Sequence, residues 1–475
     1  MKRFIFLTAA IIFSVSATYA QPSLSSYLNN DLELQRLCLE VKKAELQDKK
    51  TSIENGIDIT LSTGTATFIA NDEGTSISFS PSVKFSAPQV QNLSLAASSQ
   101  IKIEAGSDKT ADTSISLGID LISGTALSRK ITLLKSERAL LEAKRALQNR
   151  ALEAEKEYYT ELKSLYTTAS NITSLQKDMY KDTIDFESVK AKGYATTSAS
   201  YRQAEMKVIS DKHDVEKKIH ELEHDCAVFA SKCGKEFSEG TNPEDFLPVE
   251  IEHDEPVDIK SFDKNCYTKI ESARYKQQLA ELERLADKNF SLTANAGYTF
   301  KNSSTTFSDN AKKSDTIDAG LNATYKGITL GAGINLPTDG SSPSYTAFAS
   351  IKPNTFRTAS IKEQINSYNI EEELIALKSA EDDYNTLVVD KQSELNDLLW
   401  SKKTNEETFE LYSKLTNDMK KLLDQGLVKE TEYLNAYANK MSYKFKMLIN
   451  DIEFIIYNNS TRLLFCRDSE LKESK

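Results

Sequence analysis

The chain matches itself at a constant separation of 233 positions along almost its whole length. Solenoid repeats recur every ~20–50 residues, so this long spacing indicates that the repeated unit is itself a structure of several elements. Two such units are expected to pack side by side. The aligned pairs are Gly193 with Gly426, Leu162 with Leu395, Leu165 with Leu398, Val189 with Leu422, Val215 with Leu448, Ile219 with Ile452, Leu222 with Ile455, and Cys233 with Cys466.

The first residues have the pattern of a cleavable secretory signal. Lys2 and Arg3 precede a short apolar run, and small residues end at Ala20. This order is typical of signals that are removed after export. We therefore predict that residues 1–20 form a signal peptide and that the mature protein is exported. No later stretch reaches the ~18 apolar residues of a membrane-spanning helix, so any membrane span is expected to consist of strands.

The charge balance limits the partners. Without Lys2 and Arg3, 57 basic residues face 70 acidic residues, a net charge of −13. This surplus argues against nucleic acid and against anionic lipid surfaces as partners. Hydrophobic residues make up only 39% of the chain and charged residues 27%, a small apolar share for a compact domain of this length. Much of the chain is therefore expected to be elongated, with narrow apolar stripes.

The first repeat is predicted to span residues 21–233. Apolar residues at helical spacing predict a helix over 25–55. Alternation of apolar residues with Ser and Thr, broken by turn residues, predicts antiparallel strands within 57–122. A long helix over 125–190 and a helix over 198–233 follow. Residues 234–256, rich in acidic residues with Gly and Pro among them, are predicted to form an irregular linker.

The second repeat, residues 257–466, is predicted to have the same order. It comprises a helix over 257–288, strands within 290–351, a long helix over 356–424 and a helix over 429–465, followed by a tail over 467–475. At about 1.5 Å per residue, each long helix is ~95–100 Å long, and the two shorter helices of its repeat together have about that length. Two short helices can therefore run end to end beside one long helix, with the strands at the far end.

The strand segments suit a membrane. Most are expected to have ~10–14 residues, enough for a tilted crossing of a bilayer. Alternate positions separate Ile, Leu and Phe from Ser, Thr, Asn and Gly. A soluble β-sandwich is the alternative, because amphipathic strands alone do not require a membrane. Aromatic residues that could form a girdle are Phe68, Phe79, Phe85, Tyr298, Phe300, Tyr325, Tyr345 and Phe348.

At this point the chain resembles the TolC-type outer-membrane efflux proteins, the outer membrane factors. The resemblance rests on the duplicated order of elements and on two turn segments, 192–198 and 425–431, in which Gly is followed by polar residues at a helix start. It covers essentially the whole mature chain. It implies an α+β fold, a duplicated helix-strands-long helix-helix unit. The strands of three chains would form a trimeric outer-membrane β-barrel, continued by a periplasmic α-helical coiled-coil tunnel.

The resemblance also implies a function. We expect the outer-membrane channel component of a tripartite efflux or type I secretion system, a passive conduit for drugs, other small molecules or exported protein. Its partners are then two further copies in a homotrimer, a periplasmic adaptor (membrane fusion) protein, an inner-membrane transporter and outer-membrane lipid. No enzymatic activity, no metal and no cofactor are implied. The alternative is an exported coiled-coil stalk or adhesin with a soluble β head.

The tunnel constriction is carried over by position. The inward residues that narrow the family's tunnel correspond to Glu432 and Asn435 in the second repeat and to Ala199 and Arg202 in the first. Only Glu432 keeps the acidic character. A threefold ring of Glu432 is expected to attract cations, because three like charges at close range need counter-ions. Glu430 is a further gating candidate. The alternative for both glutamates is a solvated first-turn carboxylate favoured by the helix dipole.

The periplasmic tips are expected at the two turns, where the adaptor would dock. The turn residues are Gly193 and Gly426, and Ser198 and Thr431 are expected to cap the helices that follow. A glycine is also the usual residue after any helix C-terminus, so these positions support a helical hairpin more directly than docking. The strand segments differ from the family: it supplies two strands per repeat, whereas each segment here has room for up to four.

One motif suggests an enzyme instead. His220, Glu221 and His224 fit the pattern H-E-x-x-H, which on a helix places two imidazoles on one face beside a glutamate base. Glu244 and Cys226 are possible further ligands. A catalytic zinc needs a shaped, partly dry cavity, which a coiled stalk does not provide, and the second repeat has no ligands at the equivalent positions. A solvated helix face is therefore the preferred interpretation.

Five cysteines in an exported chain permit disulfides, and their odd number leaves at least one unpaired. The alternative is that they are small buried apolar residues that never pair. The sequence assigns no pairing among Cys38, Cys226, Cys233, Cys266 and Cys466.

Overall fold

The computed structural model describes residues 23–71, 74–104, 109–122, 124–237, 246–252, 254–287, 290–304, 312–313 and 315–468. The predicted signal peptide over 1–20, most of the predicted tail and Glu244 lie outside these ranges. The fold is a mixture of helices and one sheet, as expected. The chain divides into two compact units: unit 1 is Met1–Cys38, Ala146–Tyr267 and Tyr384–Lys475, and unit 2 is Leu39–Arg145 and Thr268–Asp383.

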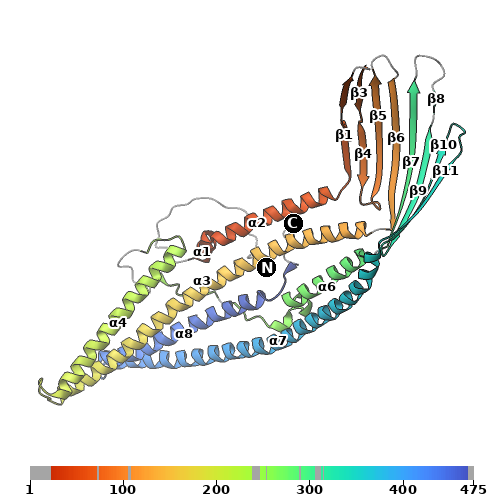
Figure 1. Ribbon diagram of the computed structural model, residues 1–475. Coiled ribbons are helices and arrows are strands. Elements are labelled where there is room, and N and C mark those ends of the chain that lie inside the picture. Colours follow the sequence, from red (N-terminus) through yellow and green to blue (C-terminus); the bar gives the residue numbers. More distant parts are fainter. Residues whose placement is uncertain are drawn as a thin grey trace. The chain divides into compact units, whose positions relative to one another are not determined.

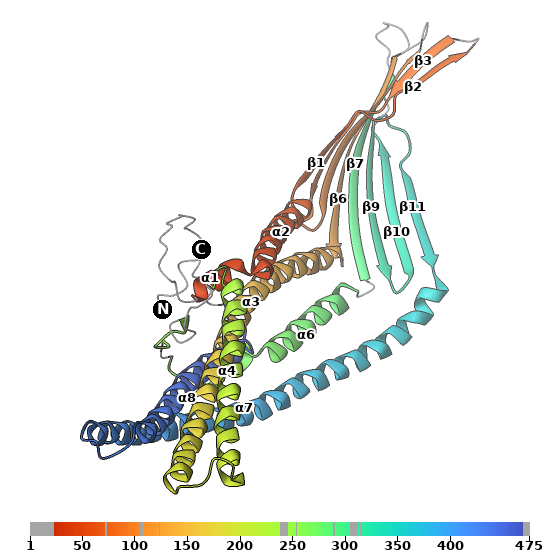
Figure 2. The same ribbon diagram turned by 90° about the vertical axis from the view of Figure 1, so that its left-hand side faces the viewer.

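Long helices dominate unit 1. Figures 1 and 2 show α4 lying antiparallel beside α3, and α8 antiparallel beside α7, each pair joined by a short turn. Over both units, the described α-helices are α1 (Leu24–Asn30), α2 (Leu32–Glu54), α3 (Thr125–Ala191), α4 (Ala199–Lys232), α6 (Thr268–Ala286), α7 (Pro353–Asp424) and α8 (Glu430–Arg462). Two short 3₁₀ turns, η1 (Ile259–Ser261) and η2 (Lys264–Cys266), precede α6.

One antiparallel sheet forms the strand part of unit 2. Its order is β1-β4-β5-β6-β7-β9-β10-β11, with β2 and β3 paired at its end and β8 on β7 (Figures 1 and 2). The segments are β1 (Asp58–Ser62), β2 (Thr67–Asn71), β3 (Gly74–Phe79), β4 (Ser82–Ala87), β5 (Leu93–Glu104), β6 (Lys109–Ile122), β7 (Phe290–Ser304), β8 (Lys312–Lys313), β9 (Thr316–Tyr325), β10 (Ile328–Pro337) and β11 (Ser344–Ile351).

The first four segments are shorter than the expected strands. β1 and β2 have 5 residues each, and β3 and β4 have 6. Because β1 pairs with β4, β2 with β3, and both β3 and β4 with β5, they are two interrupted strands of one hairpin. The first repeat therefore occupies four strand positions, and β7, β9, β10 and β11 occupy four more. Among the described strands, β1 and β11 are the two edges of the sheet.

The core of unit 1 is shared by α3, α4 and α8. Leu162 and Tyr166 of α3, each only 1% exposed, pack in one cluster with Phe229 of α4 and Ile452 of α8. Burying a side chain of this size contributes about 1.5–3 kcal/mol relative to exposure. Leu395, the counterpart of Leu162 at the 233-residue shift, packs against α8 in a second cluster. Several of the repeated apolar positions are thus core positions, whereas the repeated glycines lie in turns.

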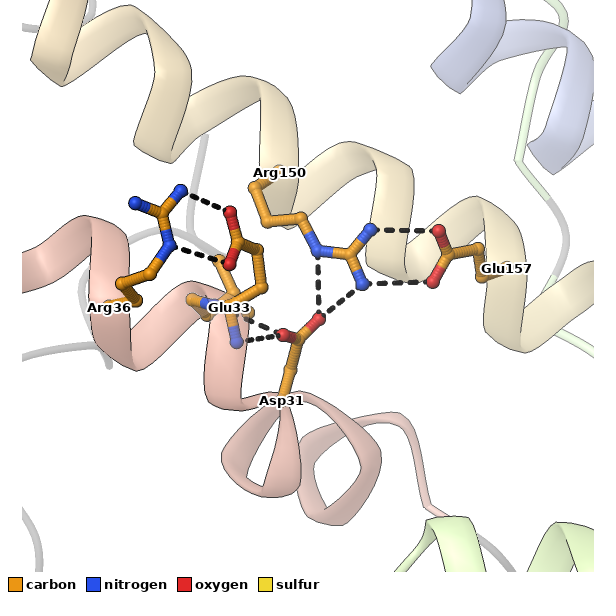
Figure 3. A network of polar contacts seen from close by, with 6 residues as sticks. Asp31, Glu33, Arg36, Arg150 and Glu157 are labelled. Atoms are coloured by element: carbon orange, nitrogen blue, oxygen red, sulfur yellow. Dashed lines mark hydrogen bonds and ion pairs between the residues drawn. The ribbon is translucent and has the colours of Figure 1, made fainter.

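The first predicted helix is broken at Asp31, where α1 ends and α2 begins. One carboxylate oxygen of Asp31 accepts hydrogen bonds from the backbone N–H groups of Glu33 (2.8 Å) and Leu34 (3.0 Å), which caps α2. The other accepts from Arg150 of α3 at 2.7 Å, and Arg150 also binds Glu157 at 2.8 Å (Figure 3). The prediction of one helix over 25–55 was therefore wrong, because the side chain of Asp31 replaces the helical hydrogen bonds at this point.

The predicted helix over 257–288 begins only at Thr268. The side chain of Asp258 accepts from the backbone N–H of Lys260, and that of Asp263 from Asn265, at 2.9 Å in both cases. Such local hydrogen bonds compete with an α-helix, and here they form two short 3₁₀ turns.

The predicted linker over 234–256 is irregular where described, but it is packed. Phe246 and Leu247 are buried against the α3 and α4 core. The hydroxyl of Tyr166 donates a hydrogen bond to the carbonyl of Pro248. Residues 246–248 therefore belong to the core of unit 1.

Candidate functional site: a two-faced sheet and two glycine turns

The register of the sheet places apolar residues of neighbouring strands opposite one another. Leu117 of β6 lies opposite Leu95 of β5, and Ile115 lies opposite Tyr298 of β7, which in turn lies opposite Ile317 of β9. Opposite residues project from the same side of a sheet. A single apolar face therefore runs across the sheet. It comprises Ile59, Leu61, Val83, Phe85, Leu95, Ala97, Ile115, Leu117, Ile119, Ala294, Ala296, Tyr298, Ile317, Ala319, Leu321, Leu330, Ala332, Ile334, Tyr345, Ala347 and Ala349.

This apolar face is open to its surroundings. Leu61 is 74% exposed, Leu330 55% and Tyr345 75%. Soluble monomers rarely expose a contiguous apolar patch of more than a few hundred Å², and larger ones mark contact with a membrane or a partner. The apolar face has the chemistry of a surface that contacts lipid.

The opposite, polar face carries Ser, Thr, Asn, Asp and Gly. Side chains bond across strands: Ser98 with Ser114 at 2.8 Å, Thr324 with Thr329 at 3.2 Å, and the amide of Asn335 with Asp318. The polar face comprises Ser94, Ser98, Ser114, Ser116, Gly118, Asp120, Thr293, Asn295, Gly297, Thr299, Asp318, Gly320, Asn322, Thr324, Thr329, Gly331, Gly333 and Asn335.

Phe348, expected in an aromatic girdle on the apolar side, lies on the polar face. It is opposite Gly331, where a Cβ atom would lie 2.2 Å from its ring. Only glycine leaves room for the ring at this position.

The two turns between long helices each have a glycine in the left-handed region. The φ angle of Gly193 is +74° and that of Gly426 is +70°. Nothing lies within 4 Å of a Cβ atom added at either position, so the backbone conformation and not packing requires glycine. At the second turn, the N–H of Gly426 bonds to the carbonyl of Leu423 and that of Leu427 to Leu422, which ends α7 as a Schellman motif.

The two expected caps behave differently. The hydroxyl of Ser198 accepts from the N–H of Tyr201 at 3.3 Å, so Ser198 caps α4 as predicted from its position. Thr431 does not cap α8, because the helix already begins at Glu430 and Lys429 occupies the cap position. Within the described chain, the Thr431 hydroxyl is buried without a hydrogen-bond partner.

The constriction candidates lie in the first two turns of α8. Glu430 is exposed, and Glu432 and Asn435 are half-buried. A carboxylate oxygen of Glu432 accepts from the backbone N–H of Lys429, whose ammonium group binds Glu187 of α3 at 2.9 Å. The contacts of one chain therefore give Glu432 a capping role. A ring of Glu432 in an assembly stays a prediction.

The corresponding residues of the first repeat lie in the first turn of α4. Ala199 is its first residue, and Arg202 binds Glu205 at 2.7 Å. The first repeat therefore presents an arginine where the second presents Asn435.

Two residues at the turns were not singled out from the sequence. Tyr194 follows Gly193 and is 48% exposed, and Leu427 follows Gly426 and is 68% exposed. They are aligned at the 233-residue shift. The sequence signal that could have identified them is an apolar or aromatic residue directly after each turn glycine. The two together give each turn an exposed apolar side chain beside polar helix starts.

A carboxyl pair links α3 to α4 near the first turn. Asp182, 7% exposed, accepts from the ammonium group of Lys207 at 2.6 Å. Burial and the neighbouring carboxylate of Asp182 raise the pKa of Asp211 to about 6. The sequence offers no periodic signal for this pair, because it depends on the facing of two helices.

The residues of the H-E-x-x-H motif lie on an exposed face of α4 and contact their own helix neighbours. His220 and His224 are exposed on α4, and an imidazole nitrogen of His220 lies 3.1 Å from the Glu223 carboxylate. The ammonium group of Lys218 binds Glu221 and lowers its pKa. In the described ranges, no three His, Cys, Asp or Glu residues are grouped as metal ligands would be. In the same ranges, no helix is both long and apolar enough to cross a membrane.

Two family models match the chain. Residues 24–251 match the TP096X N-terminal domain, and residues 252–468 match the TP096X C-terminal domain. No curated protein matches the sequence. Among solved structures, the chain is similar to the outer-membrane channel OprN (11% identity, TM-score 0.45, 93% of this chain and 88% of that chain). It is also similar to the CmeC outer membrane channel of Campylobacter jejuni (10% identity, TM-score 0.43, 95% of this chain and 88% of that chain). A further similar structure is the outer membrane protein VceC of Vibrio cholerae (11% identity, TM-score 0.42, 93% of this chain and 93% of that chain).

Proposed function

The chain belongs to the TP096X family, and we propose that it is the outer-membrane channel component of a tripartite efflux or type I secretion system. The observation that carries this proposal is the two-faced sheet, apolar and exposed on one side and polar on the other. Such a sheet can contact lipid with one face and water with the other. The same chain supplies two long helical hairpins, which we propose extend into the periplasm.

The two edges of the sheet support an assembly of several copies. β1 and β11 have no strand partner on their outer sides among the described strands. In lipid, unsatisfied backbone N–H and C=O groups cost several kcal/mol each, so open edges are not stable there. Pairing β1 of one copy with β11 of the next closes a head-to-tail ring. Eight strand positions from one chain would enclose an interior filled by side chains, so a conduit needs more copies, and we propose a homotrimer.

The turns are the proposed docking points for a periplasmic adaptor protein. Tyr194 and Leu427 supply exposed apolar contacts, and rings of such anchors with polar rims are typical of protein interfaces. An inner-membrane transporter would load the conduit through this adaptor. Drugs, other small molecules or exported protein then pass without covalent change, so we assign the chain no catalytic residues and no cofactor.

Conductance of the full-length oligomer in a planar bilayer tests the proposal. We expect small currents that prefer cations, because the Glu432 carboxylates would line the narrowest point. Glu432→Ala should increase the current. Glu430→Ala removes the exposed carboxylate of the first residue of α8 and tests the second gating candidate. It should increase the current less, because Glu432 and not Glu430 corresponds to the constriction of the family.

Folded, detergent-extracted oligomers without any conductance would contradict the channel. That result would favour an exported stalk or adhesin with a soluble β head. Thermal unfolding followed by circular dichroism shows in each case that the oligomer used is folded.

A further inference from the structure

We propose that Cys266 and Cys466 are joined by a disulfide that fastens the end of the second repeat to its beginning. The backbone N–H of Cys466 donates a hydrogen bond to the carbonyl of Cys266 at 2.7 Å. The adjacent residues Tyr267 and Phe465 form an antiparallel bridge. The chain before α6 and the chain after α8 therefore run side by side in opposite directions, and the backbones of the two cysteines are in direct contact.

A backbone hydrogen bond brings the two cysteines close enough for a disulfide. Cys266 is the last residue of the 3₁₀ turn η2, and its own N–H donates to the carbonyl of Asp263 at 2.9 Å, so one N–H···O=C bond joins it to Cys466. Standard backbone dimensions then keep the two Cα atoms within ~6.6 Å of each other, inside the ~4.4–6.8 Å that disulfides need.

Aromatic packing holds Tyr267 and Phe465 opposite each other. Tyr267 and Phe465 are buried, at 5% and 3% exposed, with ring centroids 6.0 Å apart. Phe262 stacks on Phe465 with centroids 4.5 Å apart, and Tyr384 of α7 closes the group. A slip of one residue would move these rings out of the core. The two cysteines therefore stay next to each other even without a disulfide.

The other cysteines have different surroundings. Burial raises the pKa of Cys226 to about 12 and that of Cys233 to about 11, which leaves them as inert thiols. Cys466 is the counterpart of Cys233 at the 233-residue shift, but the counterpart of Cys266 is Glu33. The first repeat thus has no second thiol at this place, and the proposed bond belongs to the second repeat alone.

The chemistry is a simple two-electron oxidation. Cys266 and Cys466 are half-buried thiols that an oxidant can reach. Each loses its S–H proton, one S–S bond forms, and two electrons pass to the oxidant. That oxidant is a disulfide, either of a dithiol oxidoreductase in an exported compartment or of oxidised glutathione, and it leaves as two thiols. Export of the chain, predicted from residues 1–20, supplies the compartment in which such bonds persist.

The bond would constrain the whole second repeat. It closes a loop that contains α6, the strands β7 to β11, α7 and α8. Cross-links that close long loops stabilise chiefly by limiting the unfolded chain. The segment after α8 would then be fixed covalently to η2.

Counting thiols tests the inference. The full-length mature protein is equilibrated with an excess of reduced over oxidised glutathione, in which a vicinal pair can close but mixed disulfides at single thiols are reversed. It is then quenched and unfolded in acid, and labelled in denaturant at neutral pH with a maleimide polyethylene glycol. Three of the five cysteines should react before reduction and all five after it. In Cys466→Ser, all four remaining cysteines should react, because the reduced glutathione in the buffer reverses mixed disulfides at single thiols. In the matched control Cys38→Ser, which changes an exposed thiol, two of four should react.

Peptide mapping should find the peptides of Cys266 and Cys466 joined and lighter by two hydrogen atoms. Five reactive thiols after oxidation would overturn the inference, and so would a bond between another pair or between two chains. Native circular dichroism of each variant checks folding. None of these measurements involves conduction. Absence of the disulfide would therefore not contradict the proposed channel, and absence of conductance would not contradict the disulfide.

Discussion

The carboxylate of Glu432 turns back to the start of its own helix and accepts a hydrogen bond from the backbone N–H of Lys429 at 3.1 Å. This contact satisfies one of the free N–H groups at the N-terminus of α8. Glu432 therefore has a role within one chain, in addition to the proposed role in a charged ring. Replacing it with alanine changes both, so a second substitution is needed to separate them.

Glu432→Gln should separate the two roles. Glutamine keeps an oxygen acceptor for the Lys429 N–H but removes the charge. We expect Glu432→Ala to lower the free energy of unfolding by about 0.5–1 kcal/mol, and Glu432→Gln by less. Both should reduce cation preference equally, measured as the reversal potential in a salt gradient. Wild-type selectivity in Glu432→Gln would show that the carboxylate charge does not control the pore.

Gly426→Ala should destabilise the second turn without a steric clash. The φ angle of +70° costs an alanine about 1–2 kcal/mol, while the space around the added Cβ atom is open. Gly426→Asn should cost less, because asparagine tolerates this region. Thermal unfolding compares the two variants. If both are equally destabilised, the cause is not the backbone conformation.

Glu271→Gln should remove a pH-dependent part of the stability. Hydrogen bonds from Arg138 and Arg145 outweigh the opposing effect of burial and lower the pKa of Glu271 from 4.5 to about 2. A lowered pKa in the folded state means that the stabilisation is present above pH ~4.5 and is lost as the pH falls towards 2. We expect a loss of about 1.5–3 kcal/mol at pH 7, because both arginines are nearly buried.

Glu283→Gln is the matched control for this change. Its partner is Lys135 at 2.7 Å, but both side chains are about half exposed, so the loss should not exceed about 1 kcal/mol. Urea unfolding between pH 2 and 7 measures both variants. An unchanged slope with pH in Glu271→Gln would contradict the assignment.

Asp211→Asn should stabilise the α3–α4 hairpin at neutral pH. The pKa of Asp211 rises from 3.8 to about 6 on folding. A raised pKa means that the contribution of this group is fully present below pH ~3.8 and is lost as the pH rises through 6. Asparagine imitates the protonated acid and can donate to Asp182. We expect a higher unfolding temperature than wild type at pH 7–8 and a smaller difference at pH 4.

The exposed residue Asp225 of α4 provides the control for Asp211. Asp225→Asn removes the same charge from the same helix, so any general effect of net charge should appear in both variants. Equal shifts for the two substitutions would attribute the effect to net charge and not to the pair with Asp182.

Neighbouring residues of β6 should distinguish the two faces of the sheet. In a background without native cysteines, Ser116→Cys on the polar face should react with a charged thiol reagent added to the water phase. Leu117→Cys on the apolar face should be protected from that reagent and be quenched by brominated lipid when it carries a fluorophore. Both native residues are exposed in one chain, so equal reaction with the charged reagent would show a soluble sheet.

The sequence predicted the order of elements because the apolar period changes at the right places. Core residues such as Leu162 and Leu395 recur at a fixed shift, and alternation in β6 and β9 appears directly in the sequence. The breaks at Asp31 and before Thr268 could not be predicted in this way, because they depend on capping side chains and on distant partners such as Arg150. The polar-face position of Phe348 depends on register, which periodicity alone does not fix.

For the candidate site, the turn glycines were visible in the sequence, and their left-handed φ angles explain why. The Thr431 cap was wrong because Glu432 reaches the earlier position Lys429. The paired carboxyls Asp182 and Asp211 come from facing helices, and no local pattern marks them.

The two glycine turns share a left-handed glycine, but they differ in length and in the side chain that they expose. The first spans seven residues, 192–198, and exposes a tyrosine; the second spans five, 425–429, and exposes a leucine. A threefold assembly of this chain would therefore present six tips of two alternating kinds. A partner with true sixfold symmetry could not fit all of them equally. A partner that contacts every tip would have to bind in two different poses. The duplication would therefore give such a partner two non-equivalent binding sites for each copy of this chain.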